Sequence, residues 1–332
     1  MDYDVLIAGG GTSGAYAAFL LAGSGLRVIV AEKRIDAGSP PSGMCLIGEN
    51  PAKKYLGNWL GKSLAVHREM EIEAFSENFT LNLKENRGIM QFSREKLDRN
   101  ILVSAGNVGA DILIRSELTS YREENNEIHA GLKTEGKDKN ITAKYLIVAT
   151  GGQPIVNALH SDECRNACFK GILSRGFFTG DMEGSLELKI DENSMILRSR
   201  NQRFWEEAII TKSDHFDSQK RDEGSIKPSA VINYEKKFHT CVPRMGQNVF
   251  PVGESAGLFG ESTGFGIDMA LESSAIAAGF IEKQITGDAE YEKYVSEINR
   301  IKERINSTPS RDKILNGEIS EIEKIVTFFR KR

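Results

Sequence analysis

Three glycines near the start of the chain, in the order Gly9-x-Gly11-x-x-Gly14, are the first residues that could do chemistry. They follow an apolar run that predicts a buried strand over residues 4–8, and they open a predicted helix over residues 14–22. In such a turn the first glycine permits the bend, the second leaves room for a pyrophosphate, and the third lets helix and strand pack closely. The motif therefore predicts a dinucleotide-binding βαβ unit.

The start of this helix is expected to bind phosphate through backbone N–H groups and its partial positive charge, so Thr12 and Ser13 join the predicted cofactor-binding residues. A second apolar strand over residues 26–31 is followed by Glu32 and Lys33, which are both among the predicted cofactor-binding residues. The carboxylate of Glu32 can accept hydrogen bonds from both ribose hydroxyls, which disfavours a 2′-phosphate. NAD and FAD both fit this unit.

Three later segments have the composition of cofactor-contacting turns. Residues 94–98 open a predicted amphipathic helix over 94–105, residues 150–152 follow an apolar strand, and residues 253–267 form a glycine-rich loop before a long helix of small residues. The cofactor-binding residues predicted there are Arg94, Gly151, Gly253, Glu254, Gly264, Gly266 and Ile267.

With these motifs the chain resembles the flavoprotein superfamily that includes the aromatic hydroxylases, and within it the geranylgeranyl reductase family. The resemblance runs from residue 3 to about residue 285 and is looser over residues 155–240. It implies FAD as the cofactor, with Gly9, Gly11, Ser13, Gly14 and Glu32 at its adenosine half and Arg94 near its phosphates. Glu254 stands where the family has an aspartate that contacts the phosphate–ribityl region, and its extra methylene allows a direct contact or one through water.

The resemblance also places the start of the helix after Gly264 against the pyrimidine ring of the flavin. Reduced flavin carries negative charge at N1 and O2, which backbone donors and a helix N-terminus stabilise. The alternative is that the small residues of this helix reflect tight packing only.

Two residues are predicted to serve the reaction. Cys45 follows a Pro/Gly-rich loop in which several reductases of the resembled family carry a cysteine near the flavin. It would relay a proton, pack against the ring, or have a structural role only. Trp205 is the possible counterpart of an aromatic residue on the family's substrate sheet, or a core or rim tryptophan.

Composition excludes other classes. The net charge of −4 and pI near 5.9 give no basic face for nucleic acid. Neither a signal peptide nor a membrane-spanning run is apparent. The four cysteines do not make a disulfide framework or a metal site, and the histidines, among them His67, show no metal or triad spacing and are expected at the surface or in loops.

The predicted fold class is α/β. A Rossmann-like FAD-binding domain with a mixed sheet is expected over residues 1–152 and 241–285, an inserted antiparallel-sheet substrate domain over 153–240, and a C-terminal helical tail over 286–332. Within the first domain, residues 33–60 read as loop and residues 61–93 as polar and helix-leaning.

The expected activity is an FAD-dependent reductase that saturates carbon–carbon double bonds of a geranylgeranyl or prenyl chain on a lipid. The alternatives are a flavin monooxygenase or other oxidoreductase acting on an aromatic or quinone substrate, and a flavin-binding electron carrier without turnover. NAD(P)H, a deazaflavin or a ferredoxin would supply electrons, the last as a redox partner protein. We expect a cytoplasmic protein that associates peripherally with the inner face of the cell membrane.

Overall fold

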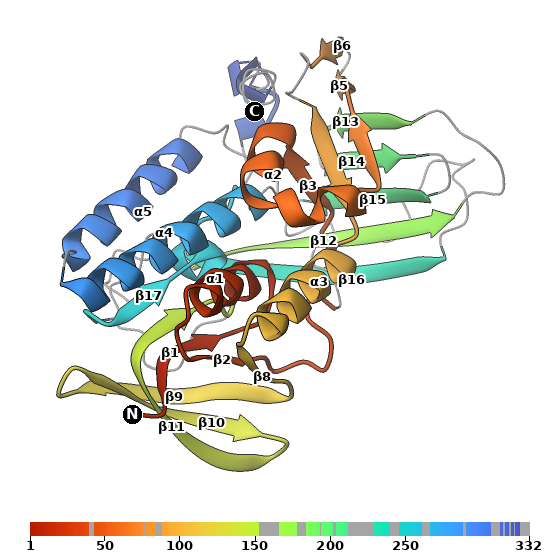
Figure 1. Ribbon diagram of the computed structural model, residues 1–332. Coiled ribbons are helices and arrows are strands. Elements are labelled where there is room, and N and C mark those ends of the chain that lie inside the picture. The colour runs from red at the N-terminus through yellow and green to blue at the C-terminus, as the bar shows by residue number, and fades with distance from the viewer. Residues whose placement is uncertain are drawn as a thin grey trace.

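The computed structural model has an α/β fold in which three sheets are joined by helices (Figure 1). It describes residues 1–39, 43–75, 77–83, 88–152, 166–177, 184–192, 194–201, 204–211, 229–239, 246–260, 266–287, 290–306, 313–314, 316–318, 320–321 and 323–325. The side chains of residues 166–170, 211, 234–239 and 306 lie outside this description.

The first sheet carries the βαβ unit. Strands β8, β2, β1, β11 and β17 are parallel neighbours in that order, and the first part of β11 pairs antiparallel with β10, which pairs with β9. Buried, wholly apolar stretches such as Val5–Ala8 suit parallel strands covered on both faces. The strands are β1 (Tyr3–Ala8), β2 (Val28–Ala31), β8 (Asp111–Leu113), β9 (Ser116–Glu124), β10 (Glu127–Thr134), β11 (Lys137–Val148) and β17 (Val249–Pro251).

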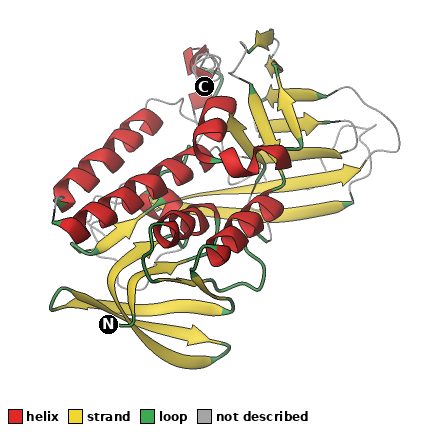
Figure 2. Ribbon diagram, in the orientation of Figure 1, coloured by secondary structure: helices red, strands yellow, loops and turns green. Residues whose placement is uncertain are grey.

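Helices gather between the β9–β10 hairpin and the second sheet in the view of Figure 2. The largest apolar core lies between the first sheet and these helices, and residues of all five α-helices of the described chain contribute to it. The helices are α1 (Thr12–Gly23), α2 (Glu49–Tyr55), α3 (Arg94–Asn107), α4 (Ile267–Thr286) and α5 (Tyr291–Asn306), with short 3₁₀ helices η1 (Gly57–Lys62) and η2 (Gly253–Ala256).

The second sheet has the order β16-β12-β15-β14-β13-β5-β6 and is antiparallel except where β13 pairs with β5. A small antiparallel sheet, β3-β7-β4, packs its Leu46 and Ile89 into the same apolar cluster as Leu186 and Leu188 of β13. The strands are β3 (Cys45–Gly48), β4 (Ala65–His67), β5 (Glu69–Ala74), β6 (Glu77–Asn82), β7 (Ile89–Phe92), β12 (Asn166–Phe177), β13 (Ser185–Ile190), β14 (Ser194–Arg200), β15 (Phe204–Thr211) and β16 (Ala230–His239).

The predicted α/β class with a Rossmann-like unit and an antiparallel second sheet is confirmed. Two local predictions are wrong. Residues 33–60 contain β3 and α2 rather than loop alone, and residues 61–93 form β4 to β7 rather than helix. The segment is a strand because it pairs with neighbouring strands. The charged residues of Glu69–Ala74 alternate with apolar ones, so the charges lie on its exposed face while Met70 and Ile72 are buried on the other.

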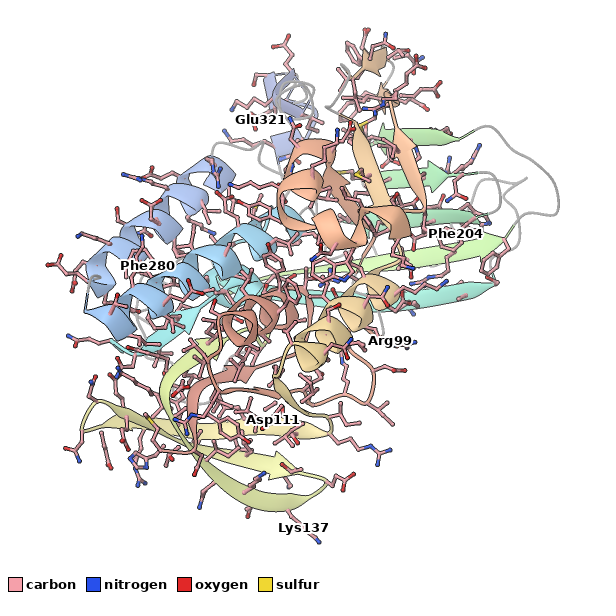
Figure 3. The ribbon with its side chains drawn as sticks, viewed as in Figure 1. Arg99, Asp111, Lys137, Phe204, Phe280 and Glu321 are labelled. Carbon is pink, nitrogen blue, oxygen red and sulfur yellow. The ribbon has the colours of Figure 1, made fainter. Side chains whose placement is uncertain are left out.

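The boundaries of the three domains stay a prediction. Strands β5 and β6, which belong to the first third of the chain, lie in the second sheet beside β13. Figure 3 shows Phe204, at the start of β15, on the side of the second sheet away from α4 and α5.

Helix α5 is anchored by Tyr294, which is fully buried. Its ring contacts Phe250 of β17 at 4.8 Å and Phe280 of α4 at 5.9 Å between centroids, both edge-on. Its hydroxyl donates a hydrogen bond to the carbonyl of Pro251. Aromatic packing therefore fixes α4 and α5 against the strand that leads to the 253–257 turn.

We expect Tyr294→Ala to lower the free energy of unfolding by about 3–5 kcal/mol, because it leaves a cavity among three aromatic rings. Tyr294→Phe should cost about 1 kcal/mol, since it removes only the hydrogen bond to Pro251. Urea denaturation measures both. Equal losses in the two variants would contradict the packing role.

Candidate functional site

The glycine turn between β1 and α1 has the close contacts that its sequence predicts. A Cβ on Gly14 would lie 1.8 Å from the carbonyl oxygen of Gly9, and one on Gly9, where φ is +104°, would lie 2.4 Å from the carbonyl oxygen of Ala149. A Cβ on Gly11 would meet its nearest atom only at 4.0 Å, a carboxylate oxygen of Asp98. Gly9 and Gly14 are thus needed for packing, whereas Gly11 leaves open space at the start of α1.

Glu32 lies beside this turn at the end of β2 and is buried. Its Oε2 accepts a hydrogen bond from the N–H of Gly10 at 2.6 Å, and its Oε1 accepts one from the N–H of Arg34 at 2.8 Å. Each oxygen keeps a second lone pair, so the oriented carboxylate can still accept from ribose hydroxyls. Lys33, next in the chain, is exposed.

Asp98 of α3 links the glycine turn to Arg94 and was not among the residues predicted from the sequence. The carboxylate is fully buried and accepts hydrogen bonds from Thr12 Oγ1 at 2.6 Å and from Arg94 Nε at 2.8 Å. Thr12 therefore directs its hydroxyl to Asp98, and Asp98 fixes the guanidinium of Arg94. The spacing of Arg94 and Asp98, one helical turn apart, was the available signal.

The turn at η2 approaches the start of α1 closely. A Cβ on Gly253, where φ is +58°, would lie 2.3 Å from Ser13 Oγ. Gly253 N–H donates to Ser273 Oγ at 3.0 Å, and Ser274 Oγ donates to the carbonyl of Ser13 at 2.9 Å. Two serines of α4 therefore tie together segments that lie 240 residues apart, Ser13 and Gly253.

Glu254 and Gly151 meet at the same place. A Cβ on Gly151 would lie 3.7 Å from Glu254 Oε2, and Ser255 Oγ donates to the carbonyl of Gly151 at 3.0 Å. The charge of Glu254 also acts on Arg94 and, with Asp98, raises the pKa of that guanidinium against the opposing effect of burial. The segments around residues 94, 151 and 254 thus converge.

Helix α4 begins at Ile267, with Gly266 as its N-cap residue. In the described part of the chain no side chain caps this N-terminus, which leaves its first backbone N–H groups available to a ligand. Gly264 lies outside the described residues. The placement of this helix start against a flavin ring stays a prediction.

Cys45 lies at the start of β3 and is almost fully buried, at 1% exposure. Burial raises the pKa of its thiol well above the ordinary range, although the nearby guanidinium of Arg94 acts in the opposite direction. The charges of Asp98, Glu206 and Glu95 also act on this thiol. Cys45 is therefore a neutral thiol within electrostatic range of both Arg94 and the second sheet.

Buried polar side chains from the small sheet and the second sheet form a row that the sequence did not reveal. Ser199 Oγ donates to Gln91 Oε1 at 2.8 Å and lies 2.9 Å from His67 Nε2, and Gln91 Nε2 donates to Glu206 Oε2 at 3.0 Å. Ser199 and Arg175 flank Glu206 on the neighbouring strands. We call these five residues, His67, Gln91, Arg175, Ser199 and Glu206, the polar row.

The placement of His67 corrects a prediction. It is 5% exposed on β4 rather than in a loop or at the surface, and burial lowers the pKa of its imidazole. Glu206 is 3% exposed, and burial raises the pKa of its carboxyl to about 7, against the opposing effects of Gln91 and Arg175. The sequence gave no sign of the polar row, because its members are single polar residues in separate alternating strands. Only the pairing of these distant strands brings the residues together.

Trp205 points to the face of β15 opposite Glu206, because successive strand residues alternate. Its indole lies against Gly176, where a Cβ would be 2.6 Å from Nε1. Trp205 is thus on the other side of the sheet from the polar row and Gln91. Its role in binding a substrate stays a prediction.

The residues present fit the adenosine diphosphate half of FAD. The open space at Gly11 and the N-terminus of α1 suit a pyrophosphate. The Glu32 carboxylate, oriented by two backbone N–H groups, suits the ribose diol that follows it. The guanidinium of Arg94, held by Asp98, supplies positive charge within electrostatic range of Glu254. The donor set is that of a dinucleotide site, and it lies at the carboxyl ends of β1, β2 and β11.

The fold and the glycine turn define a dinucleotide-dependent oxidoreductase. Residues 3–174 match the family described as pyridine nucleotide-disulphide oxidoreductase, so the chain belongs to that family. The protein is a flavin oxidoreductase.

Curated relatives agree with the resemblance seen in the motifs. Digeranylgeranylglycerophospholipid reductase 2 of Methanosphaera stadtmanae is 24% identical over 100% of this chain and 92% of its own length. Digeranylgeranylglycerophospholipid reductase of Picrophilus torridus is 30% identical over 46% of this chain and 40% of its own length. The predicted similarity to geranylgeranyl reductases is confirmed.

Solved structures share the fold. A geranylgeranyl bacteriochlorophyll reductase-like protein of Thermoplasma acidophilum superposes with a TM-score of 0.74 at 19% identity, covering 99% of this chain and 90% of its own. The myxobacterial chondrochloren halogenase CndH superposes with a TM-score of 0.73 at 15% identity, covering 92% and 80%. At these identities the likeness concerns the fold alone.

The contrast between Gly11 and Gly14 gives a test of the predicted phosphate-binding turn. We expect Gly14→Ala to cost about 1–3 kcal/mol of stability, because its methyl group meets the Gly9 carbonyl. Gly11→Ala should change stability by less than about 0.5 kcal/mol and weaken FAD binding strongly, because its methyl group fills only the phosphate space. Urea denaturation of the flavin-free protein and fluorescence titration with FAD measure the two effects. Wild-type affinity in Gly11→Ala would refute the assignment.

Glu206 gives a pH-dependent test of burial. Its folded-state pKa of about 7 exceeds the ordinary 4.5, so between these values the folded protein binds more protons than the unfolded chain and stability falls as pH rises. The loss totals about 3 kcal/mol and is complete above pH 7. E206Q cannot undergo this ionisation. The free energy of unfolding of E206Q minus that of wild type, measured by urea titration, should therefore increase by about 3 kcal/mol between pH 4.5 and pH 8. A constant difference across this range would contradict the shift.

Proposed function

We propose that this protein is an FAD-dependent reductase that saturates carbon–carbon double bonds of a prenyl chain on a lipid. The observation that carries the proposal is the similarity to a digeranylgeranylglycerophospholipid reductase along the whole chain, rather than over the dinucleotide unit alone. Flavin-dependent halogenases share this fold, so the competing proposal is a flavoprotein that acts on a different substrate.

The chain's own residues would hold the cofactor by its phosphates and ribose. Gly11, Ser13 and the N-terminus of α1 bind the pyrophosphate, Glu32 binds the ribose hydroxyls, and Arg94 balances the phosphate charge. Glu254 and Gly151 lie where the next part of the cofactor would extend, and Ile267 begins the helix that would face the ring. When bound and reduced, FAD would supply a hydride to the substrate, and a separate donor would then reduce the flavin again by two electrons.

An isoprenoid substrate would need no charged contact along its chain. Each buried methylene contributes about 0.8 kcal/mol, so a five-carbon unit contributes roughly 3–4 kcal/mol to binding. The second sheet offers an apolar inner face with Leu173, Ala208 and Ile210 buried on adjacent strands. We propose that the prenyl chain is bound on this side of the protein.

The electron donor is proposed to be diffusible, and NAD(P)H, a deazaflavin and a ferredoxin are the three to compare. Among the described residues no helix has the length and apolar character needed to cross a membrane. We also propose that the protein is cytoplasmic and reaches a lipid substrate by peripheral contact with the inner face of the cell membrane.

Purified protein with photoreduced flavin, mixed with geranylgeranyl lipid without oxygen, should reoxidise its flavin and yield a lipid heavier by two hydrogens for each bond reduced. Absorbance follows the flavin, and mass spectrometry of an organic extract follows the lipid. A matched saturated lipid is the control. If prenyl lipids leave the reduced flavin unchanged while small phenols are hydroxylated in air, the monooxygenase alternative holds instead.

A further inference from the structure

Residues 50–68 form a surface segment whose charged side chains are all positive. The segment includes Lys53, Lys54, Lys62 and Arg68 and contains no aspartate or glutamate. All four cationic side chains are exposed. The segment runs through α2, η1 and β4, so a chain with a net charge of −4 carries a local concentration of positive charge at these elements.

Two of the cations meet at one carboxylate. Glu49, which is buried at the start of α2, pairs with Lys53 Nζ at 3.0 Å and with the guanidinium of Arg68. The hydrogen bond from Arg68 lowers the pKa of the Glu49 carboxyl to about 2, so this group is ionised at neutral pH. The pairing fixes α2 beside the end of β4, and one negative charge shared by two cations leaves an excess of positive charge.

Exposed apolar side chains lie among these cations. Leu64 is 36% exposed and Val66 is 42% exposed. A Cβ on Gly88 would lie 2.7 Å from Arg68 Nη1 and 3.1 Å from Val66 Cγ1, so Val66 and Arg68 are neighbours. In the order β3-β7-β4, strand β4 lies at an edge of the small sheet. We call five residues the basic apolar surface: Lys53, Lys62, Leu64, Val66 and Arg68.

The acidic residues that follow in the chain point elsewhere. Glu69, Glu71 and Glu73 are exposed on β5, whereas Met70 and Ile72 pack into the apolar cluster shared with the small sheet. Because strand residues alternate, the three carboxylates lie on the face of the second sheet that is turned away from the small sheet.

The combination of charge and apolar groups favours a membrane as the partner. Anionic headgroups attract lysine and arginine at a bilayer surface, and apolar side chains between the cations can enter the headgroup region. A second copy of this chain fits less well, because a two-fold interface would bring the same positive charges against each other. An acidic protein would satisfy the cations but not the exposed Leu64 and Val66 between them.

We propose that the basic apolar surface docks the protein on an anionic lipid bilayer, with Leu64 and Val66 inserted among the headgroups and the cations at the lipid phosphates. The inference rests on the lipid substrate of the proposed function. Val66 and the buried His67 are successive residues of β4 and point to opposite faces of the strand. The strand that contacts the membrane therefore also carries a member of the polar row.

The first experiment measures binding of the purified protein to vesicles by cosedimentation. The vesicles contain phosphatidylcholine alone or an equal mixture with phosphatidylglycerol. We expect wild type to bind the mixed vesicles, less so as salt is added. K53Q/K62Q, which keeps the pairing of Arg68 with Glu49, should weaken this binding about 20-fold because two cations are lost. L64S/V66S should weaken it about 10-fold because less apolar surface leaves water.

The matched control is K137Q/K139Q, which removes two exposed lysines from the β10–β11 hairpin. That hairpin lies at the other end of the molecule from α2 (Figures 1 and 3), so wild-type binding is expected. No binding of wild type to the mixed vesicles, or equal losses in K53Q/K62Q and K137Q/K139Q, would overturn the proposal. So would binding of an acidic ferredoxin in place of vesicles, or a dimer that L64S/V66S dissociates.

The second experiment separates docking from the proposed function. With geranylgeranyl lipid dissolved in detergent, wild type and K53Q/K62Q should reoxidise photoreduced flavin at the same rate without oxygen. With subsaturating lipid in mixed vesicles, K53Q/K62Q should be slower by about 20-fold. If the lipid is reduced but wild type does not bind vesicles, docking is wrong and the proposed function stands. If wild type binds vesicles but leaves the dissolved lipid unreduced, the proposed function is wrong and docking stands.

Discussion

The close approach of backbone to backbone at the start of α1 is the constraint on which the rest of the structure depends. Gly14 packs on the carbonyl of Gly9, Gly9 packs on Ala149, and Gly253 packs on Ser13, each with no room for a side chain. These contacts bring the ends of β1, β11 and β17 to the N-terminus of helix α1. A helix N-terminus in this position presents unpaired N–H groups and partial positive charge to an anion.

The second constraint is electrostatic. Between the small sheet and the second sheet, His67, Ser199, Gln91 and Glu206 form one hydrogen-bonded chain, and burial raises the pKa of the Glu206 carboxyl to about 7. Buried polar groups of this kind are costly unless each is paired.

The local parts of this structure could be predicted from the sequence, and the long-range parts could not. The glycine spacing and the apolar runs around Glu32 gave the βαβ unit because each signal lies within one segment. The strands at residues 65–92 were missed because their charged faces resemble a polar helix until β5 pairs with β13. Asp98 had a signal one helical turn from Arg94, whereas Glu206 and Gln91 meet only through tertiary packing.

The central claim is that this chain binds a flavin by its adenosine diphosphate half, at the N-terminus of α1 and at Glu32. The most direct measurement is a comparison of FAD and FMN binding to the flavin-free protein by isothermal titration calorimetry, because FMN lacks that half. We predict one FAD bound per chain and an FMN affinity weaker by orders of magnitude. Equal affinities for the two flavins, or no binding of FAD, would contradict the account.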